Sequence, residues 1–155
     1  MRMNWLEHRI PPPLVGALIG AAMWATARLG GRLAIAANVR LGAAIVLAGI
    51  GVALAVAGAR AFRRATTTLD PRKPEAASTL VVGGIYRFTR NPMYLGVATV
   101  LLAWTVYLAA PLALAGVVLF VAYMTCFQII PEERALTAKF GADYAEYRSK
   151  VRRWL

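Results

Sequence analysis

Four apolar stretches that contain no Asp, Glu, Lys, Arg or His constrain this chain more than any other feature. They cover residues 14–27, 41–59, 95–109 and 112–130. About 20 apolar residues in a helix cross a bilayer core of about 30 Å, and only helices or closed barrels satisfy their backbone polar groups there. The sequence therefore predicts an all-α integral membrane protein with about four transmembrane helices.

The net charge is +11, from 18 basic and 7 acidic residues. In a soluble protein such an excess would suggest nucleic acid as a partner. Here the arginines flank the apolar stretches, which indicates positive-inside topology and anionic lipid headgroups instead. We therefore predict membrane lipids as partners and no nucleic acid.

The distribution of basic residues predicts the orientation in the membrane. Residues 60–90 and 134–155 hold most of the Lys and Arg, whereas the turn at 109–111 holds none. Both termini are therefore predicted to be cytoplasmic, in a bacterial inner membrane. Arg28, Arg32 and Arg40, in the link after the first stretch, oppose this orientation for the first pair of helices.

The chain reads as one membrane domain over residues 1–155. An N-terminal helix pair occupies 1–59, and a core with a helix hairpin at 92–130 occupies 60–155. Small residues recur at helical spacing, as at Gly16 and Gly20, and predict close approach of neighbouring helices.

The tail after the fourth stretch predicts a separate helix. Pro131 at its first position and Glu132 in its first turn suit a helix start. Leu136, Phe140 and Tyr144 would share one face. We expect a cytoplasmic interfacial helix that lies along the headgroups.

The polar segment at residues 80–96 contains most of the residues whose types suggest a binding role. Gly83 and Gly84 allow a tight turn or close approach to a ligand. Asn91 and Pro92 read as the N-cap and first residue of a helix, whose free N–H groups suit a carboxylate or phosphate. The alternative is a basic loop that anchors a membrane helix.

Other chemistries have little support in the sequence. Cys126 is the single cysteine and His8 the single histidine, so no internal disulfide or Cys/His metal site is predicted. The lack of ionisable residues inside the apolar stretches counts against a small proton-coupled transporter. The polar groups gather where the last two stretches meet water, a place that suits an enzyme joining a soluble cofactor to a membrane-embedded substrate.

Two segments resemble a known family. LVVGGIYRFTRNPMYLG at residues 80–96 and the pattern EExxLxxxFGxxYxxY at residues 132–147 resemble the signatures of the isoprenylcysteine carboxyl methyltransferase and phospholipid methyltransferase superfamily. The resemblance covers roughly residues 60–155, and the first two helices add nothing to it.

The resemblance implies S-adenosylmethionine as methyl donor and S-adenosylhomocysteine as product. Glu132 would hold the cationic amino end or the ribose hydroxyls, and the helix start after Asn91 would take the cofactor carboxylate. Tyr86 or Tyr94 could place a ring near the sulfonium, and such a cation–π contact is worth about 0.5–2 kcal/mol. The alternative role for each tyrosine is to anchor the chain at the lipid headgroups. The alternative for Glu132 is that it only provides favourable charge at a helix start. The implied cofactor-binding residues are Leu80, Val81, Gly84, Tyr86, Asn91, Pro92, Met93, Tyr94, Glu132 and Glu133.

The acceptor is expected to be lipophilic and embedded in the membrane, with a carboxyl, amine or thiol group to methylate. Gln128 and Arg90 are the acceptor-side candidates. Asn91 stands where the best-known members have histidine, and Gln128 stands where eukaryotic isoprenylcysteine enzymes have arginine, which disfavours a prenylcysteine carboxylate. The rival hypotheses are a non-enzymatic scaffold or lipid-binding protein and a small transporter. The sequence predicts no oligomeric state.

Overall fold

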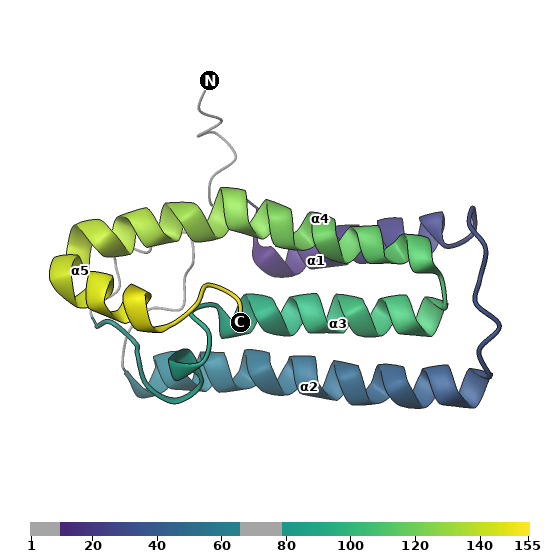
Figure 1. Ribbon diagram of the computed structural model, residues 1–155, viewed down its shortest axis with the longest axis horizontal. Helices are drawn as coiled ribbons and strands as arrows, with labels where there is room; N and C mark the ends of the chain where they lie inside the picture. Colours follow the sequence, from purple (N-terminus) through teal and green to yellow (C-terminus); the bar gives the residue numbers. More distant parts are fainter. Residues whose placement is uncertain (1–9, 66–78) are drawn as a thin grey trace, which may run out of the picture.

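The computed structural model describes residues 10–65 and 79–155, which form helices joined by loops, with no strand among them (Figure 1). The all-α prediction is confirmed. The N-terminal segment with His8 lies outside the described residues, as does most of the polar connector between the second and third apolar stretches.

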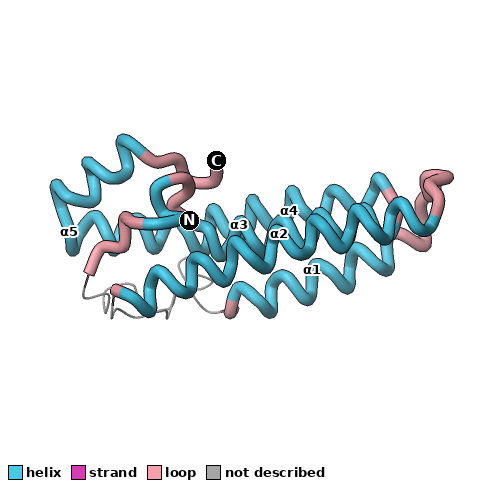
Figure 2. Tube along the Cα trace, turned by 90° about the horizontal axis from the view of Figure 1, so that it is seen from below, coloured by secondary structure: helices cyan, strands magenta, loops and turns pink. Residues whose placement is uncertain are grey.

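Four helices run side by side along the long axis and alternate in direction (Figures 1 and 2). They are α1 (Pro12–Thr26), α2 (Ala37–Arg64), α3 (Pro92–Leu108) and α4 (Leu114–Met124). Among the described residues, two helical segments are long and apolar enough to cross a membrane, namely α2 and the continuous stretch Pro111–Lys150. At 15 residues, or about 23 Å, α1 is shorter than the span that the sequence predicts. The count of four spans stays a prediction.

The helices α2 and α3 pack backbone to backbone. A Cβ atom added at Gly96 would lie 2.5 Å from the carbonyl oxygen of Gly51, and one added at Gly58 would lie 2.8 Å from Cγ of Met93. Glycine is required here because any side chain would push the helices apart. Close approach through small residues is confirmed, and the partner of α2 is α3.

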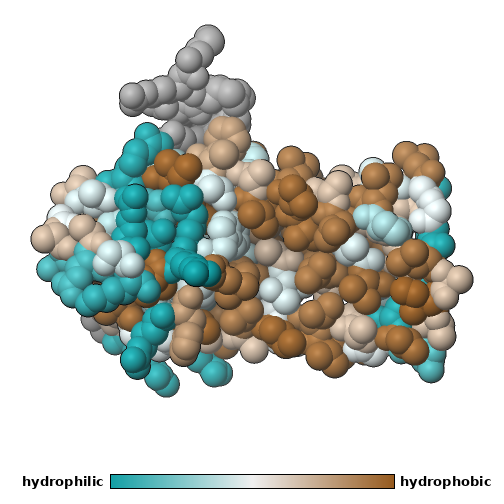
Figure 3. All heavy atoms as spheres, in the orientation of Figure 1, coloured by the Kyte–Doolittle hydropathy of each residue, from teal (hydrophilic) through white to brown (hydrophobic). Residues whose placement is uncertain are grey.

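On the face shown in Figure 3, the bundle is mostly apolar, whereas the end around α5 is polar. Ile45, Val46 and Val118 are each more than 60% exposed. The buried core lies between α1, α3 and α4, around Phe120 and Met124. A soluble protein seldom exposes so continuous an apolar surface, and a lipid surrounding accounts for it.

No separate helix begins at Pro131. Instead α4 continues through a short π-helix, η5 (Thr125–Ile129), into α5 (Ile130–Lys150). A proline ring clashes with the carbonyl four residues earlier, here that of Phe127, and removes one hydrogen bond. The wider π turn at that point accommodates both effects without a break.

The predicted single face of the tail helix is also wrong. Gly141 has φ 50° and ψ −117°, so α5 turns there and folds back over the end of the bundle (Figure 1). This turn interrupts the helical periodicity on which the predicted face of Leu136, Phe140 and Tyr144 depended. Leu136 and Tyr144 line the cavity described below, and Phe140 does not.

Candidate functional site

The segment before α3 turns tightly at Gly84, where φ is 62°. This turn begins a short 3-10 helix, η3 (Gly84–Arg87), which buries Tyr86. The ring of Tyr86 meets Phe62 of α2 edge to face, with 5.4 Å between ring centroids. The predicted glycine turn is confirmed, and it brings Tyr86 against the end of α2.

The start of α3 is where the sequence predicts it, but its capping differs. Pro92 is the first helical residue and Asn91 occupies the N-cap position, yet the Asn91 side chain caps no N–H group of α3. Its Nδ2 atom donates instead to the carbonyl oxygen of Arg153, at 2.9 Å. The first N–H groups of α3 therefore keep their capacity to bind a ligand.

Glu132 lies near the start of α5, beyond the apolar part of that helical stretch. Its Oε1 atom accepts hydrogen bonds from Oη of Tyr94 at 2.5 Å and from Nε2 of Gln128 at 2.8 Å. Burial raises the pKa of Glu132 to about 7, although these two hydrogen bonds lower it in part. Both bonds go to Oε1, so Oε2 is left for a ligand as far as the described residues are concerned.

The neighbouring carboxyl group, Glu133, has the opposite electrostatics. Arg153 donates to it from Nε at 2.9 Å and from Nη2 at 2.7 Å, and Nη2 of Arg90 lies 3.2 Å from its Oε1. Burial opposes ionisation, but these hydrogen bonds and charges outweigh it and lower the pKa of Glu133. Two adjacent carboxyls thus have pKa values pushed apart, a pattern typical of functional sites.

Arg90 is held between Glu133 and Tyr144, whose Oη atom lies 3.5 Å from its Nη1. Its side chain is only 10% exposed. Its Nε atom is buried and has no hydrogen-bond partner within residues 10–65 and 79–155. A buried donor without a partner is costly, and it indicates a place for a ligand or a water molecule.

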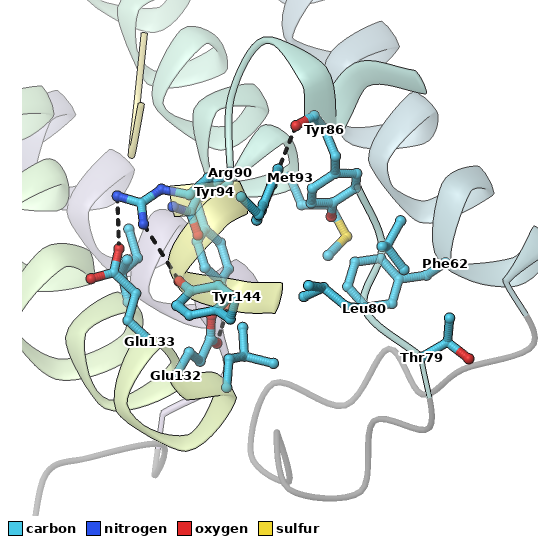
Figure 4. A pocket seen from close by; sticks show the side chains of 15 residues that line it. Phe62, Thr79, Leu80, Tyr86, Arg90, Met93, Tyr94, Glu132, Glu133 and Tyr144 are labelled. Atoms are coloured by element: carbon cyan, nitrogen blue, oxygen red, sulfur yellow. Dashed lines mark hydrogen bonds and ion pairs between the residues drawn. The ribbon is translucent and has the colours of Figure 1, made fainter. Parts of the chain in front are cut away.

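These groups line one cavity of about 100 Å³ between the end of α2, the segment before α3, and α5. In Figure 4, Arg90, Glu133 and Tyr144 lie on one side, and Tyr86, Leu80 and Phe62 lie on the other. Most of the predicted site residues line it, namely Leu80, Val81, Tyr86, Arg90, Asn91, Met93, Tyr94, Glu132 and Glu133. Gly84, Pro92 and Gln128 are not among its lining residues.

Several residues that line the cavity were not predicted from the sequence. Tyr144 and Tyr147 belong to the second motif, and their rings approach within 6.2 Å. The Oη atom of Tyr147 donates to the carbonyl oxygen of Tyr86 at 2.7 Å, which ties α5 to η3. Burial raises the pKa of Tyr86 and of Tyr147, so both phenols stay protonated at neutral pH. Phe62 comes from α2, and no motif marks it.

The C-terminal residues after α5 also bind back to the site. The N–H group of Arg90 donates to the carbonyl oxygen of Arg152 at 3.0 Å. The indole Nε1 of Trp154 donates to Oγ1 of Thr125, in the π-helix, at 3.2 Å. This tail therefore fixes the start of α3 and the π turn relative to each other, which the sequence patterns did not indicate.

Fold and site together define a helical bundle with many exposed apolar side chains and a polar pocket at its end that contains Glu132 and Glu133. The family model described as phospholipid methyltransferase matches residues 39–143, and the chain belongs to this family. The match begins in α2, so the family region extends further toward the N-terminus than residue 60. Membership indicates methyltransferase activity and a lipid substrate.

One curated relative is an uncharacterized protein from Haemophilus influenzae. It is 49% identical over 63 residues, which is 41% of this chain and the whole of that protein. No solved structure matches the chain. Within the described residues, no group of three or more His, Cys, Asp or Glu side chains could hold a metal ion.

Proposed function

We propose that the protein transfers a methyl group from S-adenosylmethionine to a lipophilic acceptor embedded in the membrane, at the cytoplasmic face. Family membership supports the reaction class. The position of the cavity, at the polar end of an apolar bundle, supports a soluble donor that meets a membrane-embedded acceptor.

The cavity residues fit a cofactor that is cationic at its sulfonium and amino groups. Glu132 is a buried carboxyl whose Oε2 atom no described residue binds. The uncapped N-terminus of α3 suits the cofactor carboxylate, and the rings of Tyr86 and Tyr94 suit a cation. At about 100 Å³ the cavity is smaller than the roughly 300 Å³ or more of typical ligand pockets, so binding must widen it.

The bound cofactor would supply an activated methyl group, so the protein itself need not provide a nucleophile. The residues around the cavity then have to orient the acceptor and keep water out, and positioning of this kind can contribute about 7–11 kcal/mol. Arg90 lines the cavity and has a free Nε donor, which makes it the acceptor-side residue we favour. Gln128 supports Glu132 from outside the cavity.

The membrane placement is supported by the length and apolar character of α2 and of the apolar part of Pro111–Lys150. The basic residues near the cavity favour its cytoplasmic side, where the cofactor is available. The group that is methylated, whether carboxyl, amine or thiol, is best identified by assaying labelled S-adenosylmethionine against lipid amines, lipophilic thiols and prenylcysteines.

The buried carboxyl of Glu132 carries the proposal, and calorimetry of the full chain in detergent tests it. S-adenosylmethionine should bind, S-adenosylhomocysteine should compete, and Glu132→Gln should weaken binding about 10- to 150-fold, because a hydrogen bond to a charged group is worth about 1.5–3 kcal/mol. Glu146→Gln is the matched control, since Glu146 lies on α5 but pairs with Lys150 in solvent.

Two results would contradict the proposal. Absence of binding heat and of competition would favour the scaffold or lipid-binding alternative. Equal affinity in Glu132→Gln and the wild-type protein would refute the assignment of this cavity.

A further inference from the structure

A second, apolar groove is lined by residues of α1, α2 and α3, toward the end of the bundle opposite α5. Its volume is about 760 Å³. Small residues of α1 and α2 leave this space open, and larger side chains of α3 form the base. The residues that define it are Gly20, Ala21, Ala44, Ala48, Leu101 and Trp104.

The aromatic wall of this groove is fixed in place. The indole Nε1 of Trp104 donates to the carbonyl oxygen of Gly20 at 3.0 Å. The ring of Trp104 also stacks on Tyr107, with 5.2 Å between centroids. Because the hydrogen bond and the ring stacking fix the orientation of the Trp104 indole, the groove surface is preformed. Binding of an acyl chain then costs less conformational entropy.

Arginines stand over the aromatic residues at the mouth of the groove. The guanidinium of Arg28 lies 3.7 Å from the ring centroid of Trp24, and that of Arg40 lies 5.8 Å from the ring centroid of Tyr107. Trp24 and Tyr107 both line the groove. The two arginines thus place positive charge directly beside an apolar channel.

Within residues 10–65 and 92–131, no carboxylate balances this charge. Residues 10–65 and 92–131 contain no Asp or Glu, and they include the whole groove and the link that carries Arg28, Arg32 and Arg40. These are also the arginines that oppose the predicted orientation of the first helix pair. An anionic group from outside the chain would account for them.

We propose that this groove binds one anionic glycerophospholipid, with an acyl chain along α3 and the phosphate beside Arg28 and Arg40. Charge complementarity at the mouth and the apolar lining below it select this occupant over a zwitterionic lipid. The inference rests on the membrane placement of the proposed function, but it does not depend on methyl transfer.

Native mass spectrometry of the full chain, purified in detergent and titrated with phosphatidylglycerol or phosphatidylcholine, tests the charge requirement. Phosphatidylglycerol should form a one-to-one complex, and Arg28→Gln combined with Arg40→Gln should weaken it at least fivefold. Arg63→Gln combined with Arg64→Gln, at the other end of α2, is the matched control and should leave it unchanged. Equal binding of the two lipids, or no loss in the first double variant, would overturn the proposal.

A second variant tests the groove itself. Ala48→Phe fills the channel without a change of charge and should weaken phosphatidylglycerol binding at least fivefold, whereas inorganic phosphate should not displace the lipid. Unchanged binding in Ala48→Phe, or displacement by phosphate alone, would show that no acyl chain occupies the groove and would overturn the proposal. Calorimetry with S-adenosylmethionine on the same variants should give wild-type affinity, so that a failure here is distinguishable from a failure of the proposed function.

Discussion

The two ends of the bundle differ in whether their charged side chains have partners. At the pocket end, Glu133 is bound by Arg90 and Arg153, and Glu132 accepts two hydrogen bonds from neutral donors. At the other end, Arg28, Arg32 and Arg40 have no carboxylate nearby in the sequence. Paired charges fix side-chain positions, as a reaction requires, whereas unpaired charges remain available to an outside partner.

The largest expected difference between the two ends is in how they contribute to the pH dependence of the unfolding free energy, which we expect to come from Glu132 at the pocket end. The folded pKa of Glu132, about 7, lies above its ordinary value of 4.5. The folded state therefore holds a proton that the unfolded state releases between these values. Unfolding free energy should fall by about 3 kcal/mol from pH 4.5 to pH 7. Equilibrium denaturation in nonionic detergent across this range measures the slope.

Variants assign this slope to one end. Glu132→Gln should flatten it, and Arg28→Gln combined with Arg40→Gln should preserve it. Glu133 has a lowered pKa, so its contribution is complete above about pH 4.5 and is lost only at lower pH. A slope that persists in Glu132→Gln would place the titrating group elsewhere.

Removal of one arginine from each end gives a direct comparison. Arg153→Ala takes two hydrogen bonds from the buried Glu133 and should lower the unfolding free energy by about 2 kcal/mol, since a buried carboxylate loses part of its compensation. Arg28→Ala leaves no buried charge unpaired and removes only the contact with the Trp24 ring, so in detergent without anionic lipid it should cost about 0.5–1 kcal/mol at most. Equal losses in both variants would mean that the ends do not differ in the way we describe.

The smallest expected effect concerns the backbone. Gly141 has φ 50° and ψ −117°, a region that side chains rarely adopt, so Gly141→Ala should destabilise by about 1 kcal/mol. Gly49→Ala in α2 is the control, because a Cβ atom there meets nothing within 4 Å. Thermal melting that shows the same loss in both would contradict a special role for the turn at Gly141.

Local patterns predicted the elements of the fold better than their connections. Pro92 marks the start of α3 and Gly84 marks the turn before it, because each residue restricts or frees its own backbone. Pro131 misled the same reasoning, since a local rule cannot anticipate that a π turn would absorb the missing hydrogen bond. Gly141 was visible in the motif, but glycine alone does not tell a turn from a helical residue.

The candidate site shows the same limit. The two motifs named most residues around the cavity, including Tyr86 and Glu132, because the cavity is lined mainly by the segment before α3 and by α5, where the motifs lie. Phe62 lies in an unmarked helix, and Arg153 acts through contacts with Asn91 and Glu133 that are far away in sequence. Such long-range pairings follow from the packing of α5 and its tail and leave no periodic signal.

The π-helix at Thr125–Ile129 has a consequence for how tolerant this chain is of length changes. Its wider turn takes up one extra residue, and each residue of an α-helix advances by about 100°. Deletion of a single residue there would close the wide turn into an ordinary α-helix and keep Glu132 facing Tyr94, whereas deletion of a residue in α4 would swing Glu132 about a quarter-turn away from Tyr94. The π turn thus gives this continuous helix one place where a residue can be lost or gained while the apolar side of α4 and the pocket side of α5 keep their relative orientation.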